Sequence, residues 1–194
     1  MRWFTSVAAF GAVIMMTVVS PVAAQDCAAT KPVEELEAED VQALYDCIKD
    51  ALVEGYRSGD NQVAQEYRDW KAASVRPASP GVHGERFLMT WVNEVGYDQY
   101  VEFAEEGVEM PEGTVIAKES FKLNDAGAIQ PGPLFIMTKA AAGGAPDADD
   151  WVYSAVQPNG KPMGIAQSFC HDCHGAFEGQ DALGYPIEDV RVSR

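Results

Sequence analysis

A five-residue C-x-x-C-H motif stands near the end of the chain, at Cys170, His171, Asp172, Cys173 and His174. Two cysteines at this spacing share one turn of a helix, so both thiols can add to the vinyl groups of one porphyrin. The histidine that follows can then ligate the iron beneath the ring. The motif therefore predicts a haem c cofactor, with Cys170 and Cys173 as attachment residues and His174 as the axial ligand.

Three other interpretations of the motif remain open from the residues alone. A structural disulfide between Cys170 and Cys173 would not need His174, and a thioredoxin-like redox pair is expected just after an early strand. A structural zinc site would need one or two further ligands. His83 is the only histidine outside the motif, so the sequence favours haem.

The late position of the motif limits what can complete the haem site. Only twenty residues follow His174, so sequence upstream of the motif must supply the opposite face of the haem. The upstream methionines lie in or beside strand patterns and are expected to fill the core rather than to bind iron. They are Met89, Met110, Met137 and Met163. The sequence therefore predicts an open iron position, which suits gas binding or catalysis better than simple electron carriage.

The elements that must position the motif follow from hydrophobic spacing. Helical periodicity covers residues 33–56 and 61–73, and a short helix is expected to carry the motif itself. Strand composition marks four further segments, which turn residues separate. They are residues 86–92, 113–122, 133–138 and 151–156. The sequence therefore predicts an α+β fold with a mostly antiparallel β-sheet core, flanking N-terminal helices and a C-terminal haem-attachment helix.

The charge of the chain limits its partners. The 194 residues include 30 acidic and 14 basic side chains, for a net charge of −16. Such a field repels phosphate backbones and anionic lipids, so we expect neither nucleic-acid binding nor membrane binding. An acidic surface either suits a basic protein partner or simply keeps an exported protein soluble.

The first residues have the pattern of a secretory leader. Arg2 precedes an apolar run at residues 7–19, and small residues up to Ala24 precede Gln25, as at a signal-peptidase site. The run is shorter than the ~20 apolar residues of a membrane-spanning helix, although an uncleaved anchor is the alternative. We therefore expect a cleaved signal peptide at residues 1–24 and a single domain at residues 25–194.

Export also allows disulfides, because oxidising compartments do not reduce them. Cys27 lies near the expected mature N-terminus, and Cys47 lies on the expected helix at residues 33–56. A bridge between them would tie the N-terminal segment to the fold and restrict the unfolded chain. We therefore expect a disulfide between Cys27 and Cys47.

Five segments of the chain match a known pattern when taken in order. They read HGERFL from His83, WVNEVGY from Trp91, MPEGTVIAKE from Met110, PGPLFIM from Pro131 and FCHDCHG from Phe169. With the late haem motif, they make the region from about Tyr67 to Arg191 similar to the cytochrome P460 family. The resemblance implies an antiparallel β fold with flanking helices, a single c-type haem, a homodimer and the bacterial periplasm.

The family that the chain resembles includes two chemistries. In cytochromes P460 proper, a lysine is joined to the porphyrin, and the enzyme oxidises hydroxylamine to nitrogen oxides such as nitric oxide, nitrous oxide or nitrite. For this chain, we expect a soluble cytochrome to accept the electrons. The related cytochromes c′-β lack the link and bind nitric oxide in an apolar pocket. Hydroxylamine oxidation is the leading hypothesis and non-enzymatic nitric-oxide binding or sensing is the alternative, so whether the chain is an enzyme stays open.

The resemblance also indicates which lysine would form the crosslinked haem P460. Lys118 follows the GTVIA stretch where the family's strand lysine stands, and Lys122 is the second candidate. Both share one face of the predicted strand with Ile116, and the residues alone would place both lysines at the surface. Burial at a haem would disfavour the ammonium form and leave a neutral amine as a nucleophile.

A carboxylate near the iron would help hydroxylamine oxidation by accepting protons. Glu109, Glu119 and Glu188 are candidates, although the acidic surplus makes a surface position the expectation for each. Aromatic residues of the strands could form an apolar ceiling over the haem, but they more often belong to a core. They are Phe87, Trp91, Phe103 and Phe121.

Overall fold

The computed structural model describes residues 27–193, so the expected signal peptide lies outside the described residues. Within this range, seven strands form one antiparallel sheet in the order β1-β2-β3-β5-β6-β7, and β4 also pairs with β3. The strands are β1 (Lys71–Ala72), β2 (Phe87–Val92), β3 (Val115–Leu123), β4 (Ile129–Pro131), β5 (Leu134–Lys139), β6 (Trp151–Val156) and β7 (Pro162–Met163). The expected α+β fold is confirmed.

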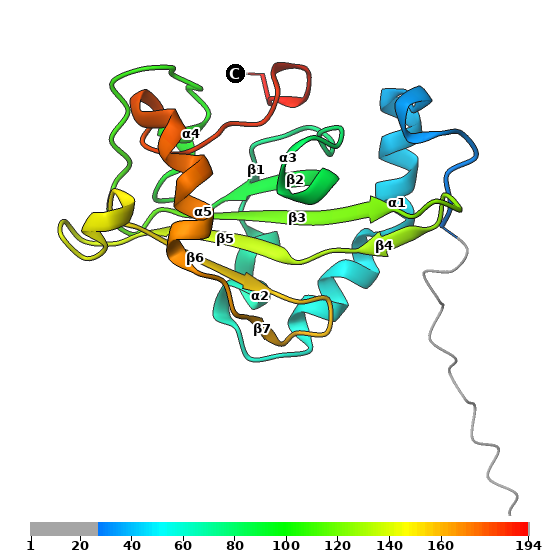
Figure 1. Cartoon of the computed structure of the whole chain (residues 1–194), viewed down its shortest axis with the longest axis horizontal. Coiled ribbons are helices and arrows are strands. Elements are labelled where there is room, and N and C mark those ends of the chain that lie inside the picture. Colours follow the sequence, from blue (N-terminus) through cyan, green and yellow to red (C-terminus); the bar gives the residue numbers. More distant parts are fainter. Residues whose placement is uncertain (1–26, 194) are drawn as a thin grey trace, which may run out of the picture.

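Helices cover both faces of this sheet. They are α1 (Ala38–Arg57), α2 (Gln62–Glu66), α3 (Val82–Glu85), α4 (Tyr97–Tyr100) and α5 (Gln167–His174). In Figure 1, α5 crosses in front of β5 and β6, whereas α1 and α2 lie on the other side of the sheet. Among residues 27–193, no helix combines the length and the apolar character that crossing a membrane requires.

The first predicted helix begins later than expected. Residues 33–56 show helical spacing, but α1 starts at Ala38 because Glu37 and Asp40 form a capping box. The Glu37 backbone N–H donates to the Asp40 carboxylate at 3.0 Å. The preceding Val33–Glu35 segment is a separate 3-10 turn.

The second predicted helix ends earlier than expected. Of residues 61–73, only Gln62–Glu66 are α-helical, and a 3-10 turn leads from them into β1. β1 forms because its two residues pair with the edge of β2, a contact that local spacing does not reveal. The four predicted strands are confirmed as β2, β3, β5 and β6, whereas β1, β4 and β7 are too short to show a pattern.

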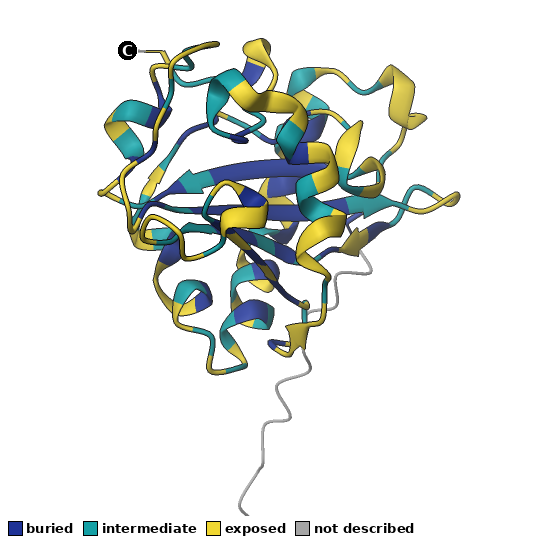
Figure 2. Cartoon of the chain, turned by 60° about the vertical axis from the view of Figure 1, so that its left-hand side comes forward, coloured by how far each residue is buried: buried dark blue, intermediate teal, exposed yellow. Residues whose placement is uncertain are grey.

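β3 lies within the sheet and has both faces covered. Its Lys118 pairs with Thr90 of β2 on one side and with Phe135 of β5 on the other. Because side chains alternate along a strand, Lys118 and Glu119 point to opposite faces. Figure 2 shows the central strands as a dark blue, buried band between helices with exposed outer surfaces.

Each face of the sheet carries its own apolar core. The core towards α1 includes large side chains from the helix and from β2, β3 and β5, among them Ile48, Leu52, Phe87, Phe121 and Ile136. The core towards α5 includes strand residues and the segment after α5, among them Ile116, Met137, Trp151, Tyr153 and Leu183. Residues 116–121 of β3 are therefore removed from water whichever way they point, whereas the ends of the strand are half-buried.

A buried carboxylate ties α1 to β3. Glu119 is 1% exposed and accepts three hydrogen bonds at 2.5 Å, from the Tyr45 hydroxyl, the Tyr67 hydroxyl and Arg68 Nε. Burial raises the pKa of both tyrosines, and the charge of Glu119 adds to the rise, so both hydroxyls stay protonated as donors. These partners replace the water that a buried carboxylate loses.

The Arg68→Met variant tests this cluster. Removing the guanidinium leaves the Glu119 carboxylate buried without a cation, which we expect to lower the free energy of unfolding by about 3–5 kcal/mol. Urea unfolding followed by circular dichroism measures the loss. Lys49→Met is the control, because Lys49 pairs with Asp46 in an exposed ion pair and its loss should cost less than about 1 kcal/mol. Equal losses in the two variants would contradict this account.

The expected disulfide between Cys27 and Cys47 is present in the structure. It joins the N-terminal segment to α1, and the Cys27 carbonyl accepts a hydrogen bond from the Ile129 N–H of β4 at 3.1 Å. The bridge therefore fixes the N-terminal segment between α1 and the sheet.

Loss of the disulfide should destabilise the fold through the unfolded chain. The bridge closes a loop with a sequence separation of 20, for which chain entropy gives about 3 kcal/mol. We expect the Cys27→Ser/Cys47→Ser double variant to unfold at correspondingly lower urea, and a reductant to lower the stability of the parent protein but not of the variant. An unchanged urea midpoint would refute this role.

Candidate functional site

The side chain of Gln167, the first residue of α5, attaches this helix to the sheet. The Gln167 amide accepts the Tyr153 N–H at 2.7 Å and donates to the Tyr153 carbonyl at 2.8 Å, so it pairs with β6 as another strand would. At the other end of α5, the His174 ring lies 5.4 Å from the Tyr153 ring, centroid to centroid. Tyr153 thus contacts the helix at both ends and fixes the motif over β6.

The two cysteines of the motif are free thiols. Cys170 is half-buried and Cys173 is exposed, and the structure forms no bridge between them. The neighbouring Phe169 is 74% exposed, which leaves apolar surface beside the thiols. In the described part of the chain, no group of three His, Cys, Asp or Glu side chains is arranged to hold a metal ion by itself. α5 also follows the last strand rather than an early one, unlike a thioredoxin-like motif.

His174 is buried with its tautomer fixed. Its Nδ1 lies 2.6 Å from the Ala182 carbonyl oxygen, and because a carbonyl only accepts, Nδ1 carries the proton. Nε2 therefore holds a free lone pair, as a metal-binding histidine requires. Burial lowers the pKa of His174 to about 4, and the charge of Lys118 adds to the shift, so the ring is neutral at pH 7.

A segment after α5, which we call the 181–184 strap (residues 181–184), holds both His174 and Lys118. The Ala182 carbonyl accepts from His174, and the Gly184 carbonyl accepts from Lys118 Nζ at 3.2 Å. Asp181 fixes the start of the strap, because its carboxylate bonds the Met110 N–H at 2.8 Å and Lys139 Nζ at 2.7 Å. Gly184 has a φ of 54°, a left-handed conformation that a side chain disfavours.

Lys118 is a buried cation on the α5 side of the sheet. Its side chain is covered by the strap, and its ammonium donates to a backbone carbonyl rather than to a carboxylate. Burial lowers the pKa of Lys118 to about 8, so a fraction of the amine is neutral at neutral pH. The expectation from periodicity alone, that this lysine lies at the surface, is therefore wrong.

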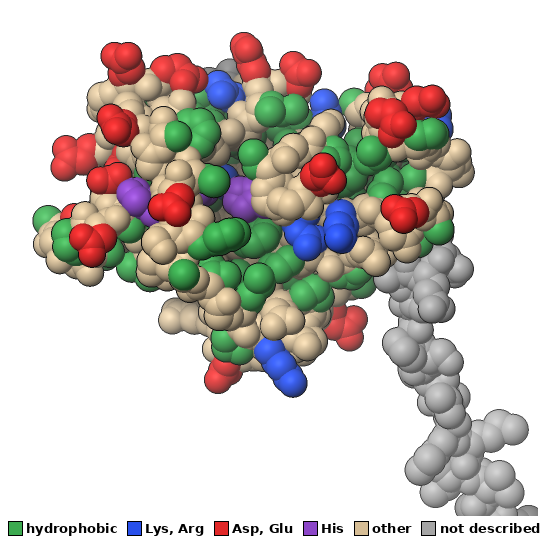
Figure 3. All heavy atoms as spheres, viewed as in Figure 1, with side chains coloured by type: hydrophobic (Ala, Val, Ile, Leu, Met, Phe, Trp, Pro, Cys, Tyr) green, Lys and Arg blue, Asp and Glu red, His purple; other side chains and the backbone are tan. Residues whose placement is uncertain are grey.

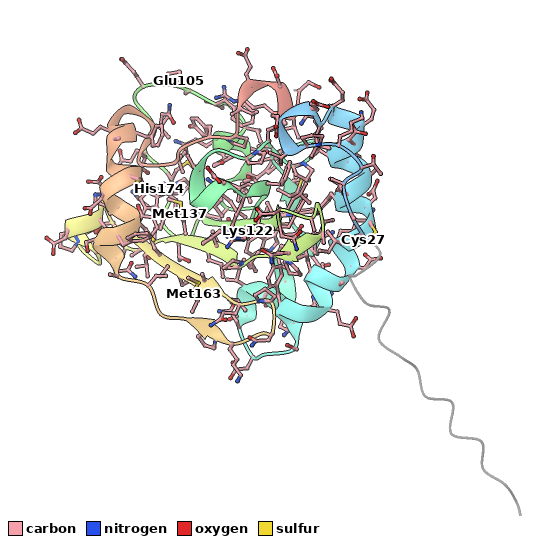
Figure 4. All side chains as sticks on the ribbon, turned by 45° about the vertical axis from the view of Figure 1, so that its right-hand side comes forward. Cys27, Glu105, Lys122, Met137, Met163 and His174 are labelled. Atoms are coloured by element: carbon pink, nitrogen blue, oxygen red, sulfur yellow. A yellow bond between two sulfur atoms is a disulfide. The ribbon has the colours of Figure 1, made fainter. Side chains whose placement is uncertain are left out.

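Lys122 lies farther along the same strand and is only half-buried. It pairs with Gln130 of β4, whereas Lys118 pairs with β5, and the four residue steps from one lysine to the other span roughly 13 Å along the strand. Lys122 is the second-last residue of β3, and in Figure 4 it is labelled apart from His174 and Met137. Of the two candidates, the structure brings Lys118 to His174.

His83, the histidine outside the motif, also lies at this site. Its ring centroid is 6.0 Å from that of His174 and 4.9 Å from that of Phe135. Burial lowers the pKa of His83 to about 3, with a further contribution from the charge of Lys118. The sequence analysis gave His83 no role. Two features could have indicated one: His83 begins the HGERFL segment, and it is the only histidine outside the C-x-x-C-H motif.

The structure brings none of the three candidate carboxylates into contact with His174 or Lys118 among the described residues. Glu109 and Glu188 are exposed, and Glu119 binds Arg68 on the opposite face of the sheet. Three of the four proposed ceiling aromatics, Phe87, Trp91 and Phe121, belong to the α1-side core, and Phe103 packs against Tyr100 and Tyr185. The aromatic rings that do lie near His174 are those of Tyr153 and, through His83, Phe135.

The surface around α5 combines apolar and acidic zones. Figure 3 shows histidine side chains (purple) on this face, with apolar side chains (green) below them and acidic side chains (red) at the rim. A hollow of about 510 Å³ beside α5 is bounded by polar groups, including Asp149, Glu178 and Asp181. Such a polar lining does not suit the apolar face of a porphyrin. The apolar surface below the histidines in Figure 3 suits a porphyrin better.

Comparison with known protein families finds a match to this chain. A family model described as Cytochrome P460 matches residues 64–183, which include Lys118 and the whole motif. The chain belongs to the cytochrome P460 family. The resemblance from sequence motifs is thereby confirmed, and membership implies a c-type haem protein. A search of curated proteins finds no match.

The residues of this cytochrome P460 fit a c-type haem. Cys170 and Cys173 are free and one helical turn apart, and Nε2 of His174 is left without a proton by the bond to Ala182. Two further buried nitrogens are poorly satisfied: Lys118 Nζ has one carbonyl partner, and His83 Nδ1 has no partner among the described residues. An iron porphyrin at this place would engage these groups, so the thiols, His174 and Lys118 are the residues to hold it.

The buried charge of Lys118 should make the stability of the haem-free protein depend on pH. Below pH 8 the folded and unfolded chains both carry the proton, so the cost of burying the charge is fully present. Between about pH 8 and 10.5 the folded lysine releases its proton first, and this cost, about 3 kcal/mol, is relieved as the pH rises.

We therefore expect Lys118→Met to stabilise the cytochrome P460 at pH 7, with the gain shrinking as the pH approaches 10. Urea unfolding in a Cys170→Ala/Cys173→Ala background, which cannot attach a porphyrin, measures the difference from the parent. Lys122→Met is the matched control and should give no such pH-dependent gain. A gain that is constant from pH 7 to 10 would refute the buried charge.

Proposed function

We propose that this cytochrome P460 is a periplasmic enzyme that oxidises hydroxylamine at a lysine-crosslinked c-type haem. The observation that carries the proposal is the burial of Lys118 beside His174, with a lowered pKa and a single carbonyl partner. A lysine held in this state has little structural value, since an apolar residue would be more stable there. A covalent bond between the Lys118 amine and the porphyrin would account for the buried position of this lysine.

The protein residues have separate tasks in this proposal. Cys170 and Cys173 hold the porphyrin by thioether bonds, and His174 ligates iron through Nε2 while the Ala182 carbonyl orients its ring. When bound, the haem supplies an iron site that accepts electrons from a small nitrogen ligand. Lys118, as a neutral amine, would be the nucleophile that bonds to the porphyrin edge. The new N–C bond would replace one N–H and one C–H bond, and a peroxide would accept the two electrons and two protons released.

Hydroxylamine oxidation also requires an exit for electrons. The reaction removes one proton for each electron, and we propose that a soluble cytochrome accepts the electrons. The net charge of −16 and the acidic rim around α5 in Figure 3 support a basic partner of this kind. The leader-like N-terminus and the disulfide support the periplasmic location, and the homodimer is proposed from the family resemblance.

Nitric-oxide binding without turnover is the second candidate function. It is favoured by one observation, that none of the three candidate carboxylates lies near His174. Without a carboxylate, protons leaving hydroxylamine would have to pass to another acceptor. The absorption spectrum and the turnover assay below distinguish the two functions.

The Lys118→Ala variant tests the crosslink and the reaction together. We expect the parent protein to show a Soret band far to the red of ordinary c-type haem, and the variant to show an ordinary c-type spectrum with haem still attached at Cys170 and Cys173. Turnover of hydroxylamine with an oxidised soluble cytochrome should be lost in the variant, because the modified ring is absent. Peptide mass spectrometry should find the haem peptide linked to the Lys118 peptide in the parent protein alone.

Two comparisons complete this experiment. Lys122→Ala should keep the parent spectrum, since Lys122 lies along the strand from the site, and His174→Ala should lose the axial ligand while the thioether bonds remain. A parent protein with an ordinary high-spin c-type spectrum, tight nitric-oxide binding and no turnover would replace the enzyme proposal with the nitric-oxide binder.

A further inference from the structure

Arg86 and Lys122 form a pair of cations on the α5 side of the sheet. Phe87 of β2 pairs with Phe121 of β3, and both rings belong to the α1-side core. Arg86 directly precedes β2 with an extended backbone, so the next position outward places it opposite Lys122. Side chains alternate along a strand, and both cations therefore turn to the face that also carries Lys118.

Neither cation has an anionic partner. Arg86 Nη1 is buried without a hydrogen-bond partner, and within residues 27–193 no carboxylate forms an ion pair with Arg86 or Lys122. Like charges on opposite strand positions repel, and a buried donor without an acceptor is costly.

Other basic residues of this range do find a carboxylate, as expected in a chain with 30 acidic and 14 basic residues. They are Lys31, Lys49, Arg68, Lys139 and Arg191. The pair of Arg86 and Lys122 is therefore open to an anion that these parts of the protein do not supply.

The pair lies at the end of the site that is farther from α5. The strand register aligns Tyr153, which fixes α5, with Ile116 of β3. Lys118 is two residues and Lys122 six residues beyond that level. In Figure 3, basic side chains (blue) lie at the end of the apolar surface that is farther from the histidines. A porphyrin attached at α5 and lying on this surface would point its far edge towards the pair.

We propose that Arg86 and Lys122 bind the two propionate groups of the haem at the end of the site opposite α5. The proposal rests on the haem of the proposed function and adds the residues that hold its acidic edge. A c-type haem carries its propionates on the two pyrrole rings without thioether bonds, so they project away from the motif. A guanidinium binds a carboxylate through two parallel N–H donors, and an ammonium binds one as a point charge. Two carboxylates would satisfy Arg86 Nη1 and remove the repulsion between the cations.

The midpoint potential of the haem-loaded protein tests this pair. We expect Arg86→Met and Lys122→Met to keep covalent haem and the parent Soret band, because the propionates are not conjugated with the ring. Each variant should shift the equilibrium about tenfold towards ferric iron, or about 59 mV for one electron, since a nearby cation favours the ferrous form. Lys161→Met is the matched control, because Lys161 is exposed between β6 and β7 and should leave the potential unchanged.

Resonance Raman spectroscopy separates direct contact from the effect of a distant charge. The propionate bending band falls in frequency when a propionate loses a donor, so it should fall in both variants and stay in place in Lys161→Met. An unchanged band in both variants, or an equal change in the control, would overturn propionate binding while the proposed function stands. A parent protein without covalent haem would overturn the proposed function as well, so the two failures are distinguishable.

Discussion

Two adjacent residues of β3 carry opposite charges into the interior, and the rest of the structure is arranged around them. Lys118 and Glu119 point to opposite faces of a strand that is paired on both sides. Helix α1 must cover one face and α5 with the 181–184 strap the other, because a charge on an uncovered strand would simply be solvated. The sheet therefore separates a fully compensated charge from a poorly compensated one by the thickness of a single strand.

The two charges are treated differently by their surroundings. Glu119 receives three donors, one of which is the Arg68 cation, so its burial is compensated within the α1-side core. Lys118 receives one backbone carbonyl, which satisfies a fraction of what an ammonium can donate. Compensating one buried charge fully and its neighbour poorly costs stability, and the proposed role of Lys118 at the haem gives a reason for that cost.

Features with a local sequence signal could be predicted, whereas features that depend on contacts between distant segments could not. The α+β fold, four strands, the Cys27–Cys47 disulfide and the family were predicted, because alternation, turn residues and motif order are local signals. The burial of Lys118 required the family resemblance, since Ile116 is its only strongly apolar neighbour on that strand face. The 181–184 strap and the place of His83 were not predicted, because they depend on contacts between distant segments. Glu119 was weighed as a site acid, and only the register of β3 against α1 shows that it serves the fold.

The strap has a consequence for the order in which the molecule is completed. Both carbonyls that hold His174 and Lys118 come after the C-x-x-C-H motif, within the last residues of the chain. A segment that follows the motif can lie away from the site without any change in α5, so the site closes only when residues 181–184 pack against His174 and Lys118. The order of the chain thus allows a porphyrin to meet an open motif before the histidine tautomer is fixed and the lysine is covered.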